Sequence, residues 1–358
     1  MKIAIFDPYL DTMSGGEKYM LTAALSLAKD HDVTILWDTS KKSEIALKAK
    51  RRFGFDLTPF TFKDSFFTKK VSLFSRLIQS RAYDAILVLS DGSIPLVSCD
   101  LILHFQSPME WVKADSFLSR IKLFRVKRFI CNSVFTKEYI DKRFHIVSDI
   151  VYPPVSIQAD GDLSIKENYI LNVGRFGITG KGSSLKKQDV LADVFSEMIK
   201  SDLKNWKMVF IMSVMDQEKI DCDKFIQKYK GQPIEFIINP TNAELWSWYK
   251  KSSIYWHASG FGEDIRSHPD RAEHFGIATV EAMGAGLIPI VINAGGQREI
   301  VQNGVNGYLW DTKEELVKRT LEVIEDKKKR TEMAKASIDS VHHYSLEEFE
   351  RKIQAIFL

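Results

Sequence analysis

The chain has 358 residues, more than the usual size of one hydrophobic core, and suits two domains of ~150 to 200 residues. Its formal net charge of +3 is too small to indicate a nucleic-acid-binding protein, and no stretch approaches the ~18 apolar residues of a membrane span. The three cysteines, Cys99, Cys131 and Cys222, are widely separated, which argues against a disulfide framework or a zinc site. The first apolar run is too short for a signal peptide, so we expect a globular, cytoplasmic protein.

The first half of the chain alternates short apolar runs with helical patterns. A helix should begin near Glu17, and another should span 136–143. Apolar runs separated by helices are typical of a parallel sheet that helices cover on both faces. The expected strands are residues 2–6, 33–36, 85–89, 101–103 and 129–131.

A joint between two domains is expected at Tyr152-Pro153-Pro154, which can continue neither a helix nor a strand and precedes a polar stretch, 158–166. We therefore predict an α/β protein with doubly wound parallel-sheet domains at 1–152 and 156–340. Ligands of such sheets bind at the carboxyl ends of the strands. The strands expected in the second domain are residues 169–173, 207–212, 234–238, 254–256 and 288–292.

Two glutamates, Glu273 and Glu281, stand eight positions apart around a Phe-Gly pair. If a helix begins near Gly276, the unpaired amides of its first turn can hold a diphosphate, and each carboxylate can take a different set of hydroxyls. A nucleotide sugar fits this description. The alternative is a pair of surface glutamates that flank a helix start, one of them stabilising the helix dipole.

The same segment resembles the Glu-x7-Glu motif of the retaining family-4 glycosyltransferases of GT-B fold, and residues 289–299 continue the resemblance. It implies two Rossmann-like domains that face a central cleft, with the C-terminal helix, 341–358, completing the first domain. It also implies that Glu273 meets the sugar hydroxyls and that Glu281 meets the ribose. The amides of Phe275, Gly276 and Ile277 would meet the sugar and the phosphates.

A leaving diphosphate needs positive charge, which Arg and Lys can supply where no metal ion does. Arg175 and Lys186 match the Gly-Arg…Lys pattern of the resembled family, and the spacing to Asp189 favours Lys186 over Lys187. The loop 177–184 is longer than usual, so Lys187 stays a second candidate for donor binding. The alternative is a solvated basic loop.

Four further residues are candidates for the site. Gly15 and Gly16 would let the backbone approach a diphosphate or an acceptor, or they form a plain tight turn. His104 follows an apolar run and matches, by the resemblance, a histidine near the acceptor and the sugar; a structural role is the alternative. His257 ends another run and either lines the donor site or packs in the core.

Two stretches of the first domain, 48–74 and 120–129, combine basic and aromatic residues. Cationic amphipathic surfaces bind anionic membrane headgroups, and acceptors of the resembled family are often lipid-linked. A peripheral contact with the inner face of the membrane is therefore one expectation. Core phenylalanines beneath a solvated face are the other.

We therefore expect a metal-independent, retaining glycosyltransferase that needs no cofactor. Its donor would be a GDP- or UDP-linked hexose, with GDP-mannose favoured because the pattern around His104 and residues 152–154 is similar to mannose-transferring relatives. Its acceptor would be a glycan or a lipid-linked acceptor in cell-surface polysaccharide or glycoconjugate synthesis. Two alternatives stay open, a nucleotide-sugar epimerase of the same fold and a non-catalytic sugar-nucleotide-binding subunit.

Overall fold

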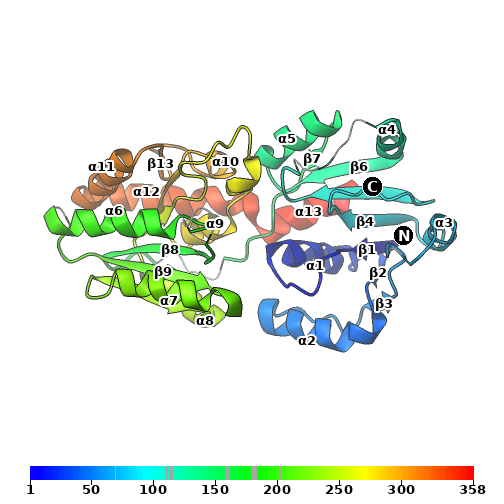
Figure 1. Ribbon diagram of the computed structural model, residues 1–358, viewed down its shortest axis with the longest axis horizontal. Helices are drawn as coiled ribbons and strands as arrows, with labels where there is room; N and C mark the ends of the chain where they lie inside the picture. Colours follow the sequence, from blue (N-terminus) through cyan, green and yellow to red (C-terminus); the bar gives the residue numbers. More distant parts are fainter. Residues whose placement is uncertain (69, 110–111, 113–115, 158–161, 179–183, 202) are drawn as a thin grey trace. The chain divides into compact units, whose positions relative to one another are not determined.

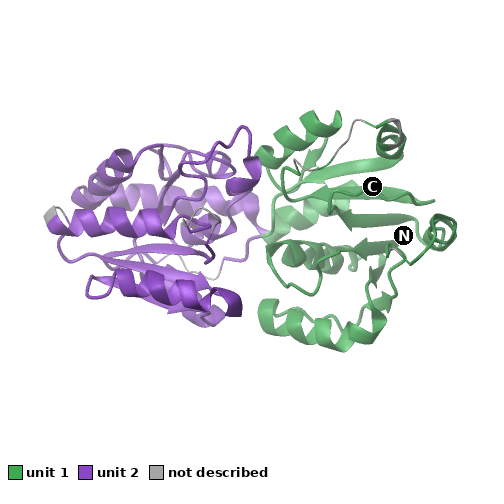
Figure 2. Cartoon of the chain, in the orientation of Figure 1, with its two compact units in different colours: residues 1–154, 346–358 green, residues 155–345 purple. Residues whose placement is uncertain are grey.

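A computed structural model describes residues 1–358 except 69, 110–111, 113–115, 158–161, 179–183 and 202. The chain divides into two compact units, which Figure 2 shows in different colours. Unit 1 comprises residues 1–154 and 346–358, and unit 2 comprises residues 155–345.

Unit 1 is a parallel sheet between helices (Figure 1). The expected strands of this half are present, and the structure adds two short ones at the edges, β3 and β7. The strands are β1 (Lys2–Phe6), β2 (Asp32–Leu36), β3 (Thr61–Lys63), β4 (Ala85–Leu89), β5 (Asp100–Phe105), β6 (Val126–Cys131) and β7 (Asp149–Ile150). The helices are α1 (Gly15–Leu27), α2 (Lys42–Phe53), α3 (Leu73–Ser80), α4 (Phe117–Phe124), α5 (Val134–Phe144) and α13 (Leu346–Ile356).

The strand order in unit 1 is β3-β2-β1-β4-β5-β6-β7, and the neighbouring strands pair in parallel. Successive residues of β1 enter different cores, because side chains alternate across a strand. Ile3 and Ile5 join one core cluster, whereas Ala4 joins the other. Helix α13 closes the first of these clusters with Phe349 and Ile353. The sheet is thus buried on both faces, as its continuous apolar strands predict.

Unit 2 repeats the design with a sheet of order β10-β9-β8-β11-β12-β13, again parallel. One large core, including Trp256 and Trp310, packs against it. The strands are β8 (Tyr169–Arg175), β9 (Lys207–Ser213), β10 (Ile234–Ile238), β11 (Ile254–His257), β12 (Ile288–Ile292) and β13 (Tyr308–Trp310). The helices are α6 (Gln188–Ser201), α7 (Lys219–Lys228), α8 (Asn242–Lys251), α9 (Ile277–Gly284), α10 (Gln297–Ile300), α11 (Lys313–Glu325) and α12 (Lys327–Ser340). The α/β fold with two parallel-sheet, Rossmann-like domains is confirmed.

The segment between α12 and α13 differs from expectation. Residues 341–345, expected with the closing helix of the first domain, belong to unit 2. The reason is Tyr344: its ring lies 5.3 Å from the ring of Phe275, and its carbonyl accepts a hydrogen bond from the amide of Val155 at 2.9 Å. No helix in the described part of the chain is both long and apolar enough to cross a membrane.

Candidate functional site

The predicted donor residues gather at the carboxyl edge of the unit 2 sheet. Arg175 ends β8 and His257 ends β11, while Glu273 lies in the loop that leads from β11 to α9. These residues come from separate parts of the chain, and the parallel sheet brings them to one edge. This is the edge at which doubly wound domains bind their ligands.

Helix α9 begins at the Phe-Gly pair, as the motif predicts. Gly276 is its N-cap, with φ 126° and ψ 52°, a backbone conformation that L side chains rarely adopt. No side chain among the described residues caps the helix. The Thr279 amide donates to the carbonyl of Gly276 at 3.0 Å, so the amides that can face a ligand are those before it, at Ile277 and Ala278. A methyl group at Gly276 would also lie 2.6 Å from Gln297 Nε2. Glycine is therefore required to turn these amides toward an anion.

Two further glycines, Gly295 and Gly296, lie against this turn and support it. The amide of Gly296 donates a hydrogen bond to the carbonyl of Glu273 at 2.8 Å. A side chain at Gly295 would collide with the backbone of Glu273, and one at Gly296 with that of Phe275. The Ala-Gly-Gly loop after β12 thus fixes the backbone that presents Glu273.

Glu273 sits between two nitrogens. Its Oε2 accepts from Lys186 Nζ at 2.8 Å and from His257 Nε2 at 3.2 Å. Burial alone would raise the pKa of Glu273, but the Lys186 charge and the His257 hydrogen bond outweigh it and hold that pKa well below its usual range. The carboxylate is therefore ionised throughout the physiological range and can accept hydrogen bonds from sugar hydroxyls.

His257 is neutral in this arrangement. Burial lowers the pKa of His257, and the nearby Lys186 lowers it further, although Glu273 opposes both effects. Because an ionised carboxylate only accepts, the proton of the neutral ring must lie on Nε2. Nδ1 is then a bare acceptor, buried and without a hydrogen-bond partner among the described residues. His257 orients Glu273.

The two adjacent lysines have different partners. Lys186 reaches Glu273, whereas Lys187 Nζ lies 2.7 Å from Glu263 Oε1, and Arg271 contacts the other oxygen of Glu263 at 2.9 Å. Lys187 has a left-handed backbone, φ 57°, which turns its side chain away from that of Lys186. The structure therefore brings Lys186 to the donor motif and leaves Lys187 in a separate, buried ion pair.

Arg175 and Gly174 complete the basic side of the site. The Arg175 side chain is exposed at the end of β8. Gly174 lies next to the lysine: a methyl group there would be in ordinary van der Waals contact with Lys186 Cγ, at 3.4 Å. Residues 179–183 of the long loop that follows lie outside the described residues.

Glu281 lies one turn into α9 and accepts a hydrogen bond from Tyr249 Oη at 3.1 Å. Burial, followed by the charge of Glu281, raises the pKa of Tyr249 well above its usual range, so the hydroxyl stays a donor. Phe275, by contrast, packs its ring into the core against Tyr344 and can contribute only its backbone. Tyr249 was not identified from the sequence, where it is one of several aromatic residues of an amphipathic helix.

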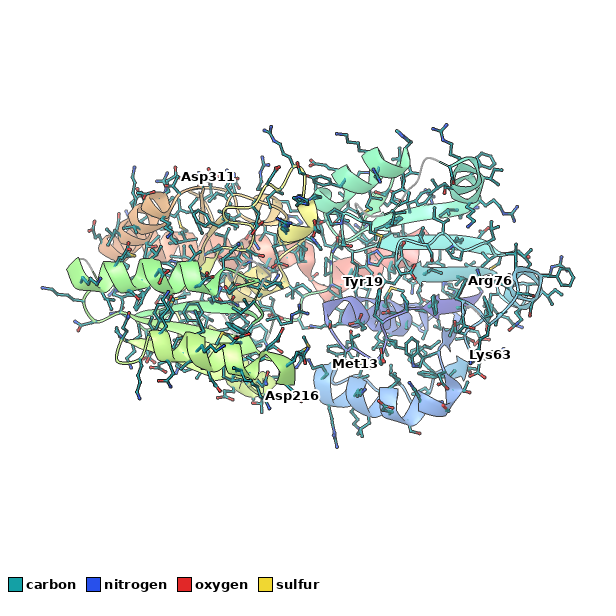
Figure 3. All side chains as sticks on the ribbon, in the orientation of Figure 1. Met13, Tyr19, Lys63, Arg76, Asp216 and Asp311 are labelled. Carbon is teal, nitrogen blue, oxygen red and sulfur yellow. The ribbon has the colours of Figure 1, made fainter. Side chains whose placement is uncertain are left out.

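The candidates of unit 1 meet at the carboxyl edge of its own sheet. Gly15 and Gly16 open α1, and the Gln106 amide donates to the Gly16 carbonyl at 3.4 Å and lies 3.1 Å from His104 Nε2. His104 is fully buried and stacks on Tyr19 at 4.1 Å between ring centroids (Figure 3 labels Tyr19). Burial lowers the pKa of His104 to about 3, so the ring is neutral.

These contacts decide where the His104 ring proton lies and whether the ring can touch a ligand. Its Nδ1 lies 3.3 Å from the carbonyl of Ile130, so the proton of the neutral ring lies there and Nε2 accepts from Gln106. His104 has no exposed surface, and its influence on a bound molecule would pass through Gln106. The sequence reasoning missed Gln106, although its place just beyond the same strand as His104 is a usable signal.

Asp7 was also missed, although it directly follows the first apolar strand. Its side chain is 2% exposed, Oδ1 accepts from the Tyr9 amide at 2.8 Å, and Oδ2 has no partner among the described residues. Burial, with the nearby charge of Glu17, raises the pKa of Asp7 to about 8. Asp7 is thus a buried carboxyl group, protonated at neutral pH, close to Glu17 of α1.

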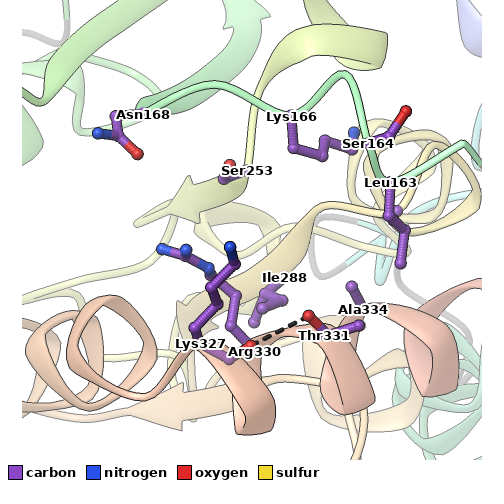
Figure 4. A pocket seen from close by; sticks show the side chains of 11 residues that line it. Leu163, Ser164, Lys166, Asn168, Ser253, Ile288, Lys327, Arg330, Thr331 and Ala334 are labelled. Carbon is purple, nitrogen blue, oxygen red and sulfur yellow. Dashed lines mark hydrogen bonds between the residues drawn. The ribbon is translucent and has the colours of Figure 1, made fainter.

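No group of three or more His, Cys, Asp and Glu side chains among the described residues is placed to hold a metal ion. A hollow of about 300 Å³ at the opposite edge of the unit 2 sheet does not belong to the site (Figure 4). It lies at the amino ends of β8, β11 and β12. One of its cations, Lys166, is held by the carbonyls of Tyr249 and Ala285 at 3.0 and 2.6 Å.

Comparison with protein families matches residues 157–339, just over half of the chain, to the glycosyl transferases group 1. The similar curated proteins include the GDP-Man:Man(3)GlcNAc(2)-PP-Dol alpha-1,2-mannosyltransferases of Dictyostelium discoideum, 24% identical over 72% of this chain, and Caenorhabditis elegans, 24% identical over 97%. The human protein of that name is 25% identical over 67%. The chain spans 56% of the Dictyostelium protein, 53% of the human one and 89% of the Caenorhabditis one.

Among solved structures, the chain is similar to a glycosyltransferase from Rickettsia africae, with a TM-score of 0.75 and 15% identity over 99% of this chain and 98% of that one. It is also similar to Anabaena HepE in complex with UDP-glucose, with a TM-score of 0.70 and 16% identity over 100% and 99%. The sucrose-phosphate synthase of Thermosynechococcus elongatus gives 0.67 and 12% over 100% and 98%. At these identities the likeness shows the fold alone, that of the GT-B enzymes.

Proposed function

The chain belongs to the glycosyl transferases group 1, and from this membership we propose that it is a retaining hexosyltransferase. It would move a sugar from a nucleotide diphosphate sugar to a glycan or a lipid-linked glycan. The observation that carries the proposal is the contact of Lys186 and His257 with Glu273 beside the uncapped start of α9. This arrangement combines a cation from the loop between β8 and α6 with a fixed carboxylate and an anion site from the loop and first turn of α9.

Each part of this arrangement has a role in holding the donor. The amides of Phe275, Gly276 and Ile277 bind the diphosphate at the start of α9. Glu273, held ionised by Lys186 and oriented by His257, accepts hydrogen bonds from the sugar hydroxyls. Glu281, which Tyr249 orients, accepts from the ribose.

Departure of the diphosphate is the step that needs positive charge. Arg175 and Lys186 supply it without a metal ion, Arg175 as a fork and Lys186 as a point charge. Lys186 contacts Glu273 at 2.8 Å. When the diphosphate binds, Lys186 contacts both the Glu273 carboxylate and the diphosphate. Binding of the sugar by Glu273 is thereby linked to binding of the phosphates. The leaving phosphate accepts the acceptor's proton, so no side chain acts as a nucleophile.

The favoured donor is GDP-mannose. This choice is supported by the curated relatives, which are named as mannosyltransferases that use GDP-mannose. The Caenorhabditis protein is 24% identical over 97% of this chain. The HepE structure contains UDP-glucose, which makes UDP-glucose the competing donor. On the acceptor side we assign Gly15, Gly16 and Gln106, with His104 holding Gln106 in place.

A thermal-shift panel of nucleotides and nucleotide sugars tests the proposal. A ligand at a hundredfold excess over its dissociation constant stabilises the native state by about 2.7 kcal/mol, so a cognate donor is visible. We expect GDP and GDP-mannose to stabilise the protein more than UDP and UDP-glucose. Transfer to a mannose-terminated acceptor, with the configuration of the product read by NMR, should follow and should survive EDTA.

Each contrary outcome identifies a different error. Donor consumption without an acceptor would indicate an epimerase or a hydrolase. Donor binding without any product across a broad acceptor panel would indicate a non-catalytic subunit. Loss of transfer in EDTA, restored by a divalent cation, would contradict the role given to Arg175 and Lys186.

A further inference from the structure

Two segments of unit 1 carry only positive charge. Residues 70–81 contain three basic residues and no acidic one, and residues 117–128 contain five basic residues and no acidic one. The whole chain has a net charge of only +3. Charge is therefore concentrated on these two segments, which include α3 and α4. The basic residues are Lys70, Arg76 and Arg81 in the first segment, and Arg120, Lys122, Arg125, Lys127 and Arg128 in the second.

The same two helices expose large apolar side chains. Phe74 of α3 is 74% exposed and Phe124 of α4 is 93% exposed. Leu73 and Ile78 accompany Phe74, and Ile121 lies one turn from Phe124, all of them exposed. Single exposed apolar residues are ordinary, but a group of five beside basic side chains marks an interaction site. We call these five residues and the eight basic ones the α3–α4 surface.

The two helices adjoin within unit 1. A surface hollow is lined by Arg81 at the end of α3 and by Phe124 and Arg125 at the end of α4. Arg125 Nη2 donates to the carbonyl of Val97 at 3.4 Å, and Ser98, next along the chain, donates through Oγ to the carbonyl of Leu77 in α3 at 2.8 Å. Figure 1 shows α3 and α4 at the same end of this unit, where Figure 3 labels Arg76.

The structure also separates these residues from the other aromatic residues of the stretch 48–74. Phe60 and Phe66 are buried in the core, and Phe53 and Phe62 pack against it. That part of the stretch matches the alternative of core phenylalanines. Phe74 differs from them because it points into solvent. Lys69, from the same stretch, lies outside the described residues.

We propose that the α3–α4 surface docks unit 1 on an anionic lipid bilayer. Phe74, Phe124 and their apolar neighbours enter the headgroup layer. The exposed cations Lys70, Arg81, Arg120 and Arg125 contact lipid phosphates, whereas Arg76 Nε donates to the carbonyl of Phe66 at 3.2 Å and Arg128 faces Asp149 at 4.0 Å. Two carboxylates lie in the same hollow, but Asp84 accepts from the amide of Lys2 at 2.7 Å and Asp100 faces Lys127 at 3.6 Å. A second copy of the chain is a poor partner, because a two-fold contact would set these cations against one another.

Docking through this surface has a geometric consequence. The hollow adjoins the amino ends of β4 and β5, whereas Gly16 and His104 lie at the carboxyl edge of the sheet. Strands of five or six residues span roughly 17 to 20 Å. The acceptor-binding edge would stand that far from the lipid surface, which suits a lipid-linked acceptor that already carries several sugars.

Vesicle sedimentation of the intact chain tests the docking. We expect binding to vesicles of phosphatidylcholine mixed with phosphatidylglycerol, little binding to phosphatidylcholine alone, and release by salt. The double variant Phe74→Ser/Phe124→Ser should bind at least about tenfold more weakly, because each ring buries apolar surface. Arg120→Gln/Arg125→Gln should weaken the preference for the anionic lipid, because two of the exposed cations are lost. The matched control is Ile220→Ser, since Ile220 is 71% exposed on unit 2 beside acidic residues.

Equal sedimentation of the wild type and the Phe74→Ser/Phe124→Ser variant would overturn the proposal, as would equal binding to neutral and anionic vesicles or no binding to either. The docking does not depend on the proposed reaction, and nucleotide binding in solution separates the two. The same variants should bind GDP and UDP like the wild type. If the chain bound vesicles but no nucleotide, the proposed function would be contradicted and the docking proposal would be supported.

Discussion

Lys186 Nζ and Glu273 Oε2 lie 2.8 Å apart, although 87 residues separate them in the chain. The adjacent lysine, Lys187, makes an equally short contact with Glu263, at 2.7 Å. Two neighbouring lysines thus hold two different carboxylates. Only the first of these carboxylates belongs to the start of α9, so the pair provides an internal comparison between the lysine proposed to bind the donor and a lysine in a separate ion pair.

The first prediction uses that comparison. Lys186→Met should lower kcat at least about a hundredfold, because one of the groups that stabilise the leaving diphosphate is lost. Lys187→Met should keep kcat but lower the free energy of unfolding by about 2 kcal/mol, since Glu263 loses one of its two buried partners and retains Arg271. Steady-state kinetics and urea unfolding of both variants measure these effects. The reverse pattern would transfer the diphosphate role to Lys187.

The second prediction concerns the glycine that begins α9. Gly276→Ala should lower the free energy of unfolding by more than about 2 kcal/mol and weaken donor binding, because it adds a collision with Gln297 to an unfavourable backbone conformation. Gly54→Ala is the matched control: Gly54 also has a positive φ, 77°, but a methyl group there meets nothing within 4 Å. That variant should lose only about 1 kcal/mol and bind the donor normally. Equal effects at the two positions would argue against a strained turn at the site.

Nucleotide binding is the third prediction. Glu281→Ala should raise the dissociation constant of GDP at least about tenfold, as expected for a lost charge-assisted hydrogen bond to the ribose. Tyr249→Phe should have a smaller effect in the same direction, because it removes only the hydroxyl that orients Glu281. Glu244→Ala, in the exposed first turn of α8, is the control for loss of a carboxylate. Calorimetric titration with GDP distinguishes the three, and unchanged affinity in Glu281→Ala would refute the ribose contact.

The long apolar strands were predictable because burial on both faces leaves a continuous apolar run. Residues 85–89 and 288–292 were expected as strands, and the structure has both with the same bounds. The edge strands were not predictable. Thr61–Lys63 has two exposed residues and one partner strand, and Asp149–Ile150 pairs only with β6, so neither leaves a strong pattern.

The donor motif was predictable for a different reason, since Gly276 and the Ala-Gly-Gly loop are required by the backbone itself. What could not be predicted is side-chain direction. The sequence places Lys186 and Lys187 side by side, and only the left-handed backbone at Lys187 separates their partners. Likewise, His104 and Asp7 lie at the ends of apolar strands, as exposed ligand-binding residues also do, and only the structure shows that both are buried, His104 against the ring of Tyr19.

The last prediction concerns the pKa of Asp7. Burial, followed by the charge of Glu17, raises this pKa from 3.8 to about 8. Between these two values the native state binds the Asp7 proton and the unfolded state does not, so stability falls as the pH rises through this window. The loss is at most about 1.4 kcal/mol per pH unit. Asp7→Asn carries a neutral group of similar shape at every pH. It should therefore match the wild type in acid and exceed the wild type's free energy of unfolding at pH 8.

Urea unfolding of the wild type and of Asp7→Asn across this pH range measures the difference. Asp91→Asn, which removes an exposed aspartate after β4, should follow the wild-type profile and control for the loss of one charge. Parallel profiles for wild type and Asp7→Asn would mean that Asp7 is ionised in the native protein. The unpartnered Oδ2 would then have to be hydrogen-bonded by a group outside the described residues, since a buried carboxylate close to Glu17 needs such a donor.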